Sequence, residues 1–241
     1  MLETYYVGSY WLARSESAEA CARRAERFFQ EIGRCDSAWN SWYRAANSFE
    51  EARKRQFVPS AANFESLFAQ EEHQIGDGFS FHLWTGDSPE ETSGVDGSCG
   101  SADTFLPSTC VLEPFDEGPV GARMLSASVM TDALRAMVVA WDPEWGVVTS
   151  TAHRDSVTEK PKAGTFVGWV MYFSRLRGPV PPLPAPVRIE RVEDKGTLVI
   201  LTPERFTVSN PEHVALAARV HELLARAGLL GKLRPWPAAA P

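Results

Sequence analysis

The sequence lacks basic residues over its central third. Residues 56–122 contain no lysine and no arginine, although the whole chain has 24 such residues in 241. About seven would be expected in that segment by chance. The same segment carries twelve carboxylates, while the rest of the chain has 24 basic and 19 acidic residues. This segregation favours a cationic protein partner and disfavours binding to nucleic acid or to an anionic membrane surface.

Other absences exclude further classes. The chain has no run of about 18 apolar residues, so no membrane-spanning helix is expected. It does not start with a basic region followed by an apolar one, so we expect no signal peptide and a cytoplasmic location. The four cysteines have neither disulfide-like nor zinc-like spacing and should be reduced thiols. No glycine-rich phosphate-binding motif occurs, and we expect no cofactor and no bound metal.

Periodicity and end signals predict several helices. Residues 18–32 repeat apolar positions every three or four residues, with Ser15 or Ser17 as N-cap and Gly33 as the end. Ser48 and Glu51 have capping-box spacing before a short helix that reaches about residue 56. Further helices are expected over residues 60–72, over residues 126–141, and after Asn210 as far as Gly228.

Strand patterns lie between these helices, over residues 4–11, 79–84, 108–114, 146–151 and 166–173. Residues 193–196 join the last two strands, 187–192 and 197–202, as a hairpin. Residues 86–89 and 94–97 are rich in glycine and aspartate, which predicts turns. The fold class is therefore α+β, with a mixed or antiparallel sheet flanked by amphipathic helices. We expect a single domain over residues 1–241, with residues 235–241 as a frayed tail.

Two alternative functions arise from weaker signals. A small hydrolase could use Cys99, since residues 97–101 resemble a nucleophile turn, but the strand before it and the helix after it are missing. It could instead use a metal held by His73, His82 and nearby carboxylates, although their spacing fits no helical metal motif. Residues 179–186 contain five prolines and could bind an aromatic-lined groove, as in an adaptor, or simply connect two strands.

The chain also resembles the immunity protein 52 family of bacterial polymorphic toxin systems. The resemblance covers nearly the whole length, and these motifs carry it in order: Tyr5-Tyr6-Val-Gly8-Ser-Tyr10-Trp11, Arg14-x-Glu16-Ser17, Cys21-Ala22-x-Arg24, Trp42-Tyr43, Gly168-Trp169-x-x-Tyr172, the Gly196 hairpin and Asn210-Pro211-x-His213. It implies an α+β fold without catalytic residues. It also implies binding and neutralisation of a toxin encoded nearby, typically a nuclease of the restriction-endonuclease fold.

Charge and resemblance together predict an immunity protein that is not an enzyme. It would neutralise a cognate toxin with a basic surface, by protein–protein contact through an acidic surface. A nuclease requires a basic groove for phosphates, and such a groove attracts carboxylates. The residues expected to contact the toxin are Asp77, Trp84, Asp87, Glu90, Glu91, Asp96 and Asp103. Phe79 and Phe105 are further candidates for aromatic anchors within the charged rim.

Overall fold

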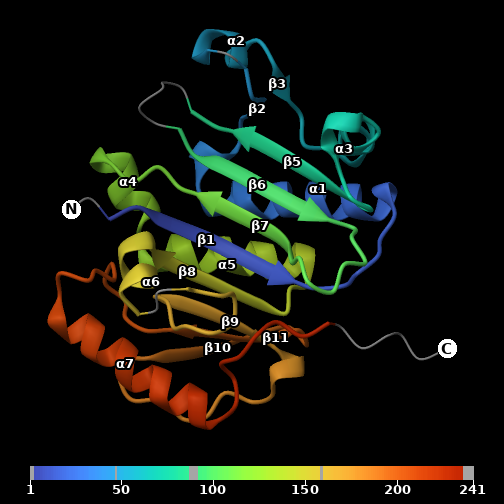
Figure 1. Ribbon diagram of the computed structural model, residues 1–241. Coiled ribbons are helices and arrows are strands. Elements are labelled where there is room, and N and C mark those ends of the chain that lie inside the picture. The colour runs from blue at the N-terminus through green and yellow to red at the C-terminus, as the bar shows by residue number, and fades with distance from the viewer. Residues whose placement is uncertain (1–2, 47, 87–91, 158–159, 236–241) are drawn as a thin grey trace.

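The structure is a computed structural model that describes residues 3–46, 48–86, 92–157 and 160–235. Its strands form one antiparallel sheet in the order β10-β11-β9-β8-β1-β7-β6-β5-β2-β3, with β4 paired to β5 (Figure 1). The strands are β1 (Tyr5–Trp11), β2 (Trp42–Arg44), β3 (Gln56–Phe57), β4 (Gln74–Ile75), β5 (Gly78–Trp84), β6 (Gly94–Cys99), β7 (Ser108–Glu113), β8 (Trp145–Ser150), β9 (Val170–Ser174), β10 (Arg188–Val192) and β11 (Gly196–Ile200).

Seven α-helices accompany the sheet in the described part of the chain: α1 (Ala18–Cys35), α2 (Phe49–Arg53), α3 (Ala61–Phe68), α4 (Gly118–Met124), α5 (Ala127–Trp141), α6 (Thr151–Val157) and α7 (Pro211–Arg226). The α+β class and the flanking helices are as the sequence predicts, and the sheet is antiparallel. The helix caps are confirmed in three places. Backbone N–H groups of Ala20, Glu51 and Glu212 donate to the side chains of Ser17 (3.2 Å), Ser48 (3.2 Å) and Asn210 (3.0 Å).

The main core lies between one face of the sheet and α1, α3 and α5, and α1 and α5 are seen behind the sheet in Figure 1. From the strands, Val7, Phe81, Val95, Cys110 and Leu112 point into this core and are fully or almost fully buried. On the opposite face, the ring of Phe166 packs edge-on against Trp145 at 5.2 Å, and Phe166 lines a cavity together with α6 and α7. The segment before β9 and the last two helices therefore cover the C-terminal half of that face.

The prediction of a turn at residues 94–97 is wrong, because these residues belong to β6. The two glycines make room for aromatic rings of the neighbouring strand β5 instead of bending the chain. A Cβ atom on Gly97 would lie 2.1 Å from Cζ of Phe81, and one on Gly94 would lie 2.8 Å from Cζ3 of Trp84. Glycine in a strand interior marks such a close approach as well as it marks a turn.

Other boundaries also differ from expectation. Helix α1 continues past Gly33 to Cys35. A Cβ atom on Gly33 would lie 2.5 Å from Oδ1 of Asn40, at the end of a rotatable side chain, so this glycine marks a close approach inside the helix and not its end. The helix expected over residues 60–72 ends at Phe68, and the sequence patterns did not reveal α4 and α6. Both of these missed helices have only seven residues, too few for an apolar periodicity to stand out.

Candidate functional site

The front face of β5, β6, β7 and β1 carries no helix in Figure 1. Strand alternation places Trp84, His82 and Asp96 there, since they alternate with the buried Phe81, Leu83 and Val95. His82 and Asp96 are direct partners across the β5–β6 register, and their side chains form an ion pair when the imidazole is protonated. The His82 ring meets Trp84 edge-on at 4.6 Å. Two of the predicted contact residues, Trp84 and Asp96, are thus brought together.

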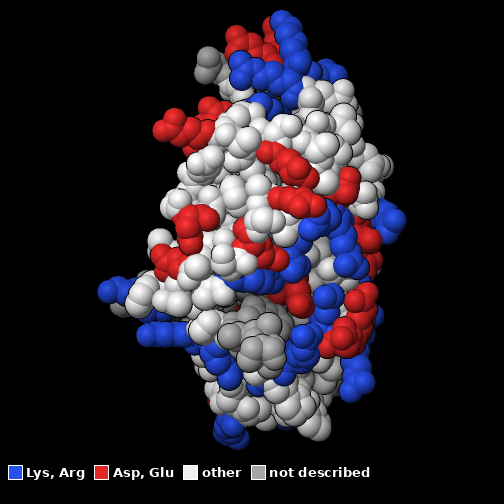
Figure 2. Space-filling view, turned by 90° about the vertical axis from the view of Figure 1, so that its right-hand side faces the viewer, with Lys and Arg blue, Asp and Glu red and all other residues white. Residues whose placement is uncertain are grey.

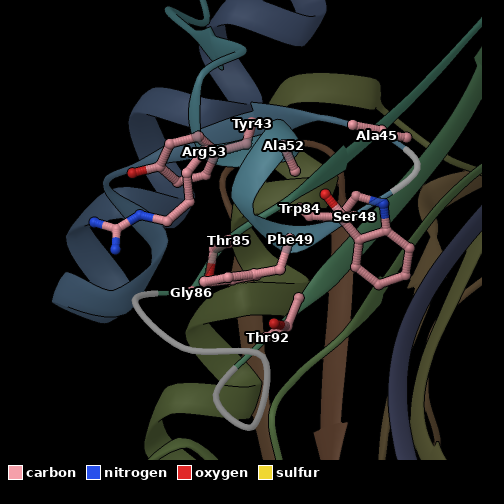
Figure 3. Close-up of a pocket in the computed structure, with 11 residues that line it drawn as sticks. Tyr43, Ala45, Ser48, Phe49, Ala52, Arg53, Trp84, Thr85, Gly86 and Thr92 are labelled. Atoms are coloured by element: carbon pink, nitrogen blue, oxygen red, sulfur yellow. The ribbon is translucent and has the colours of Figure 1, made fainter.

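A small cavity of about 170 Å³ lies beside Trp84, formed by the β2–α2 segment and the end of β5 (Figure 3). Most of its wall is apolar, with Tyr43, Phe49 and Ala52 on the side of the segment and Arg53 also lining it. Cofactor sites usually measure about 300–1,000 Å³, whereas a cavity of about 150 Å³ accommodates a benzene-sized group. Its size therefore fits one apolar side chain rather than a cofactor.

Asp77 and Asp103 lie apart from this site, where a loop follows β6. The Asp77 carboxylate accepts hydrogen bonds from Oγ of Ser101 (2.5 Å) and from the backbone N–H of Ala102 (2.9 Å), and these bonds lower its pKa. Oδ1 of Asp103 accepts from the N–H groups of Phe105 (2.6 Å) and Leu106 (3.0 Å). Both carboxylates therefore hold the loop in its conformation.

The remaining predicted contact residues, Asp87, Glu90 and Glu91, lie outside the described residues. Carboxylates of the lysine-free segment do not share one side of the described molecule. Glu65 is exposed on α3, which packs behind the sheet, whereas Asp96 lies on the front. Figure 2 shows acidic atoms interspersed with basic and uncharged ones on the side that it presents. An acidic surface that contacts a toxin would therefore have to use only some of the carboxylates in residues 56–122.

The aromatic candidates differ in exposure. Phe79 points to the helical side of the sheet, where its ring stacks on Phe68 at 5.2 Å. Phe105 and Leu106 are 89% and 69% exposed at the tip of the loop that Asp103 holds. Trp84 is only partly exposed, because its ring lies across Gly94. Trp84 and Phe105 therefore face away from the helices and are available for contact, whereas Phe79 is partly buried against the core.

Cys99, the nucleophile of the alternative hydrolase, faces the helices at the end of β6 and is almost completely buried. A hydrogen bond with Cys21 and burial together raise the pKa of the Cys99 thiol well above its ordinary value. A nucleophilic cysteine needs the opposite, a lowered pKa and access to solvent. The environment of Cys99 is that of a structural thiol.

The two histidines of the alternative metal site interact with different groups. Nδ1 of His73 lies 3.0 Å from the carbonyl oxygen of Ser80, and His82 pairs with Asp96. Within the described ranges, no three His, Cys, Asp or Glu side chains come together as a possible metal site. His153 is buried and contacts the carbonyl oxygen of Val167 through Nε2 at 3.0 Å.

The proline-rich connection over residues 179–186 also has an internal role. Val180 and Leu183 within it are partly buried against the core. A free ligand for an aromatic-lined groove would instead present its apolar side chains to solvent. As for membranes, no single described helix has the length and apolar composition to span one; only α4 and α5 together, bent by 61°, meet those criteria.

Comparison with known proteins finds a matching family and similar solved structures. The profile of a protein family described as immunity protein 52 matches residues 3–233, nearly the whole chain. Among solved structures, the chain is similar to the Pseudomonas aeruginosa T6SS protein PA0821, with a TM-score of 0.55 and 12% sequence identity. The similarity covers 96% of this chain and 79% of the other, and at this identity it shows a shared fold. No curated protein matches the sequence.

Proposed function

Because the chain belongs to the immunity protein 52 family, we propose that it binds a toxin and neutralises it by protein–protein contact, without catalysis of its own. The family match over residues 3–233 is the observation that carries this proposal. The buried thiol of Cys99 and the separate engagement of His73 and His82 support it, since the residues of the alternative hydrolase lack the environment that chemistry requires.

The proposed partner is a cationic toxin domain, such as a nuclease with a basic groove for phosphates. The support is electrostatic, because residues 56–122 supply twelve carboxylates and no basic side chain. Attraction between surfaces of opposite sign raises the association rate more than it raises final affinity. We further propose that the protein acts in the cytoplasm and that Asp87, Glu90, Glu91 and Asp96 belong to the contact region.

A charge reversal tests this electrostatic account. Changing Asp87, Glu90, Glu91 and Asp96 to lysine should slow association with the toxin domain encoded beside this gene by about tens-fold at low salt. It should also flatten the dependence of the association rate on salt, since screening acts on the attraction that the variant removes. Stopped-flow fluorescence at several ionic strengths measures both quantities.

The matched control reverses four carboxylates on α1 and α7, namely Glu19, Glu31, Glu212 and Glu222, and so has the same net charge. Its association rate should stay within about threefold of the wild-type rate, because the changed charges lie away from the proposed contact. Equal slowing in both variants would mean that only net charge matters and would refute the assignment to residues 87–96.

A further inference from the structure

The front face of the sheet is exposed over β6 and β7 and buried farther along, over β8 and β9. In β6 and β7, the side chains that point to the helices are buried, whereas Asp96, Ser98, Thr109, Val111 and Glu113 on the front are partly or fully exposed. Farther along the same face, Trp145, Val147 and Phe173 are buried under the C-terminal elements. Figure 1 shows the front of β5, β6 and β7 free of any helix.

Aromatic rings lie flat on this open face over glycines. The ring of Trp84 lies across Gly94, its register partner on β6. The ring of Tyr10 covers Gly8 on β1, where a Cβ atom would lie 2.5 Å from the Tyr10 hydroxyl. Both rings are partly exposed. Rings held in this way offer contact area with little side-chain entropy left to lose, which is why tryptophan and tyrosine are enriched at the centres of protein interfaces.

The charge on this face has one sign. The outward charged residues of β5, β6 and β7 are Asp96 and Glu113, together with the titratable His82, and these strands contain no lysine or arginine. The Asp96 side chain is 60% exposed and has His82 beside it. Basic groups lie at its margins: Arg154 of α6 lies over the Tyr6 ring at 5.8 Å, and Arg53 lines the cavity beside Trp84.

An antiparallel sheet often leaves one face to water without further purpose. A solvated face, however, is normally lined by polar side chains in alternation, whereas this one places Val111 directly beside Asp96 and the ring of Trp84 over Gly94, the register partner of Glu113. The apolar cavity of about 170 Å³ adjoins it at Trp84. A face that combines apolar contact area with carboxylates matches a partner surface that has apolar anchors beside cations.

We propose that the open face of β5, β6 and β7, centred on Trp84, Asp96 and Ser98, is the docking surface for the cationic toxin. This rests on the proposed function and replaces the loop carboxylates Asp77 and Asp103, whose oxygens already hold the loop. The cavity beside Trp84 receives one apolar side chain of the toxin.

The experiment compares two arginines placed on the open face of the sheet with two arginines placed on helix α3. The variant Asp96→Arg with Ser98→Arg changes the open face, and Glu65→Arg with Ser66→Arg changes exposed positions on α3 behind the sheet. Both pairs change one carboxylate and one serine of the lysine-free segment, so their net charges are equal. Calorimetry with the toxin domain encoded beside this gene gives Kd, and circular dichroism with thermal unfolding confirms that each variant is folded.

The open-face variant should raise Kd by about 100-fold or more, and the α3 variant should stay within about threefold of wild type. Trp84→Ala should also weaken binding by about tenfold or more. Failure of the wild-type protein to bind the toxin would refute the proposed function itself. Wild-type affinity in a folded open-face variant would refute the docking surface alone. So would sedimentation showing that the open face joins two copies of this chain while toxin binding persists.

Discussion

Replacing Arg177 by alanine is expected to lower the free energy of unfolding by about 3–5 kcal/mol. Arg177 and Glu144 form an ion pair at 2.6 Å, and both side chains are fully buried. The guanidinium also donates to the carbonyl oxygens of Leu229 (2.7 Å), Gly231 (3.1 Å) and Gly164 (3.3 Å). Its loss leaves a buried carboxylate without its main partner and several carbonyl groups without a donor.

Urea or guanidinium unfolding measures this loss. A matched control is Arg23→Ala, which breaks an exposed pair with Glu19 on α1 and should cost less than about 1 kcal/mol. The double variant Arg177→Met with Glu144→Gln should be less unstable than the sum of its single changes, because no lone charge remains buried. Arg177 joins Glu144 to the segment after α7 through Leu229 and Gly231. A loss below about 1 kcal/mol for Arg177→Ala would show that this connection does not stabilise the fold.

Replacing Trp141 by alanine is expected to cost a similar amount, about 3–5 kcal/mol, for a different reason. Trp141 on α5 is completely buried between two other rings. It stacks on Trp11 of β1 at 5.5 Å and on Phe81 of β5 at 6.1 Å, with interplanar angles of 17° and 18°. Its removal leaves a large cavity where the helical layer contacts the middle of the sheet.

The measurement is again the free energy of unfolding from a denaturant titration. Trp141→Phe should cost clearly less than Trp141→Ala, because the smaller ring still fills part of the space. Equal costs for the two variants would indicate that the surroundings collapse around any smaller side chain. A cost below about 1 kcal/mol for alanine would contradict the stacked arrangement of Trp11, Trp141 and Phe81.

Much of the fold could be predicted from local signals, and the errors have physical causes. Helix caps at Ser17, Ser48 and Asn210 satisfy N–H groups within a few residues, so the sequence contains all the information that such a cap needs. The role of Gly94 and Gly97 depends on rings from another strand. Sequence spacing cannot distinguish a glycine that turns the chain from one that lies under Trp84 or Phe81.

The candidate site could be predicted only in part. The absence of basic residues in 56–122 is visible in the sequence, and alternation in residues 79–84 places Trp84 opposite to the core. The pairing of His82 with Asp96 depends on the β5–β6 register, which crosses a loop. The internal use of Asp77 and Asp103 depends on tertiary hydrogen bonds, which charge counting ignores.

The central claim is that the protein inhibits a toxin by occupying its surface. The most direct test titrates a fixed amount of the toxin domain encoded beside this gene with the purified protein and follows the remaining toxin activity. We expect inhibition to become complete at a fixed stoichiometric ratio, with the toxin unchanged in mass and active again after separation. Complete inhibition at a small fraction of that amount, or a covalently altered toxin, would contradict neutralisation by contact and indicate an enzyme.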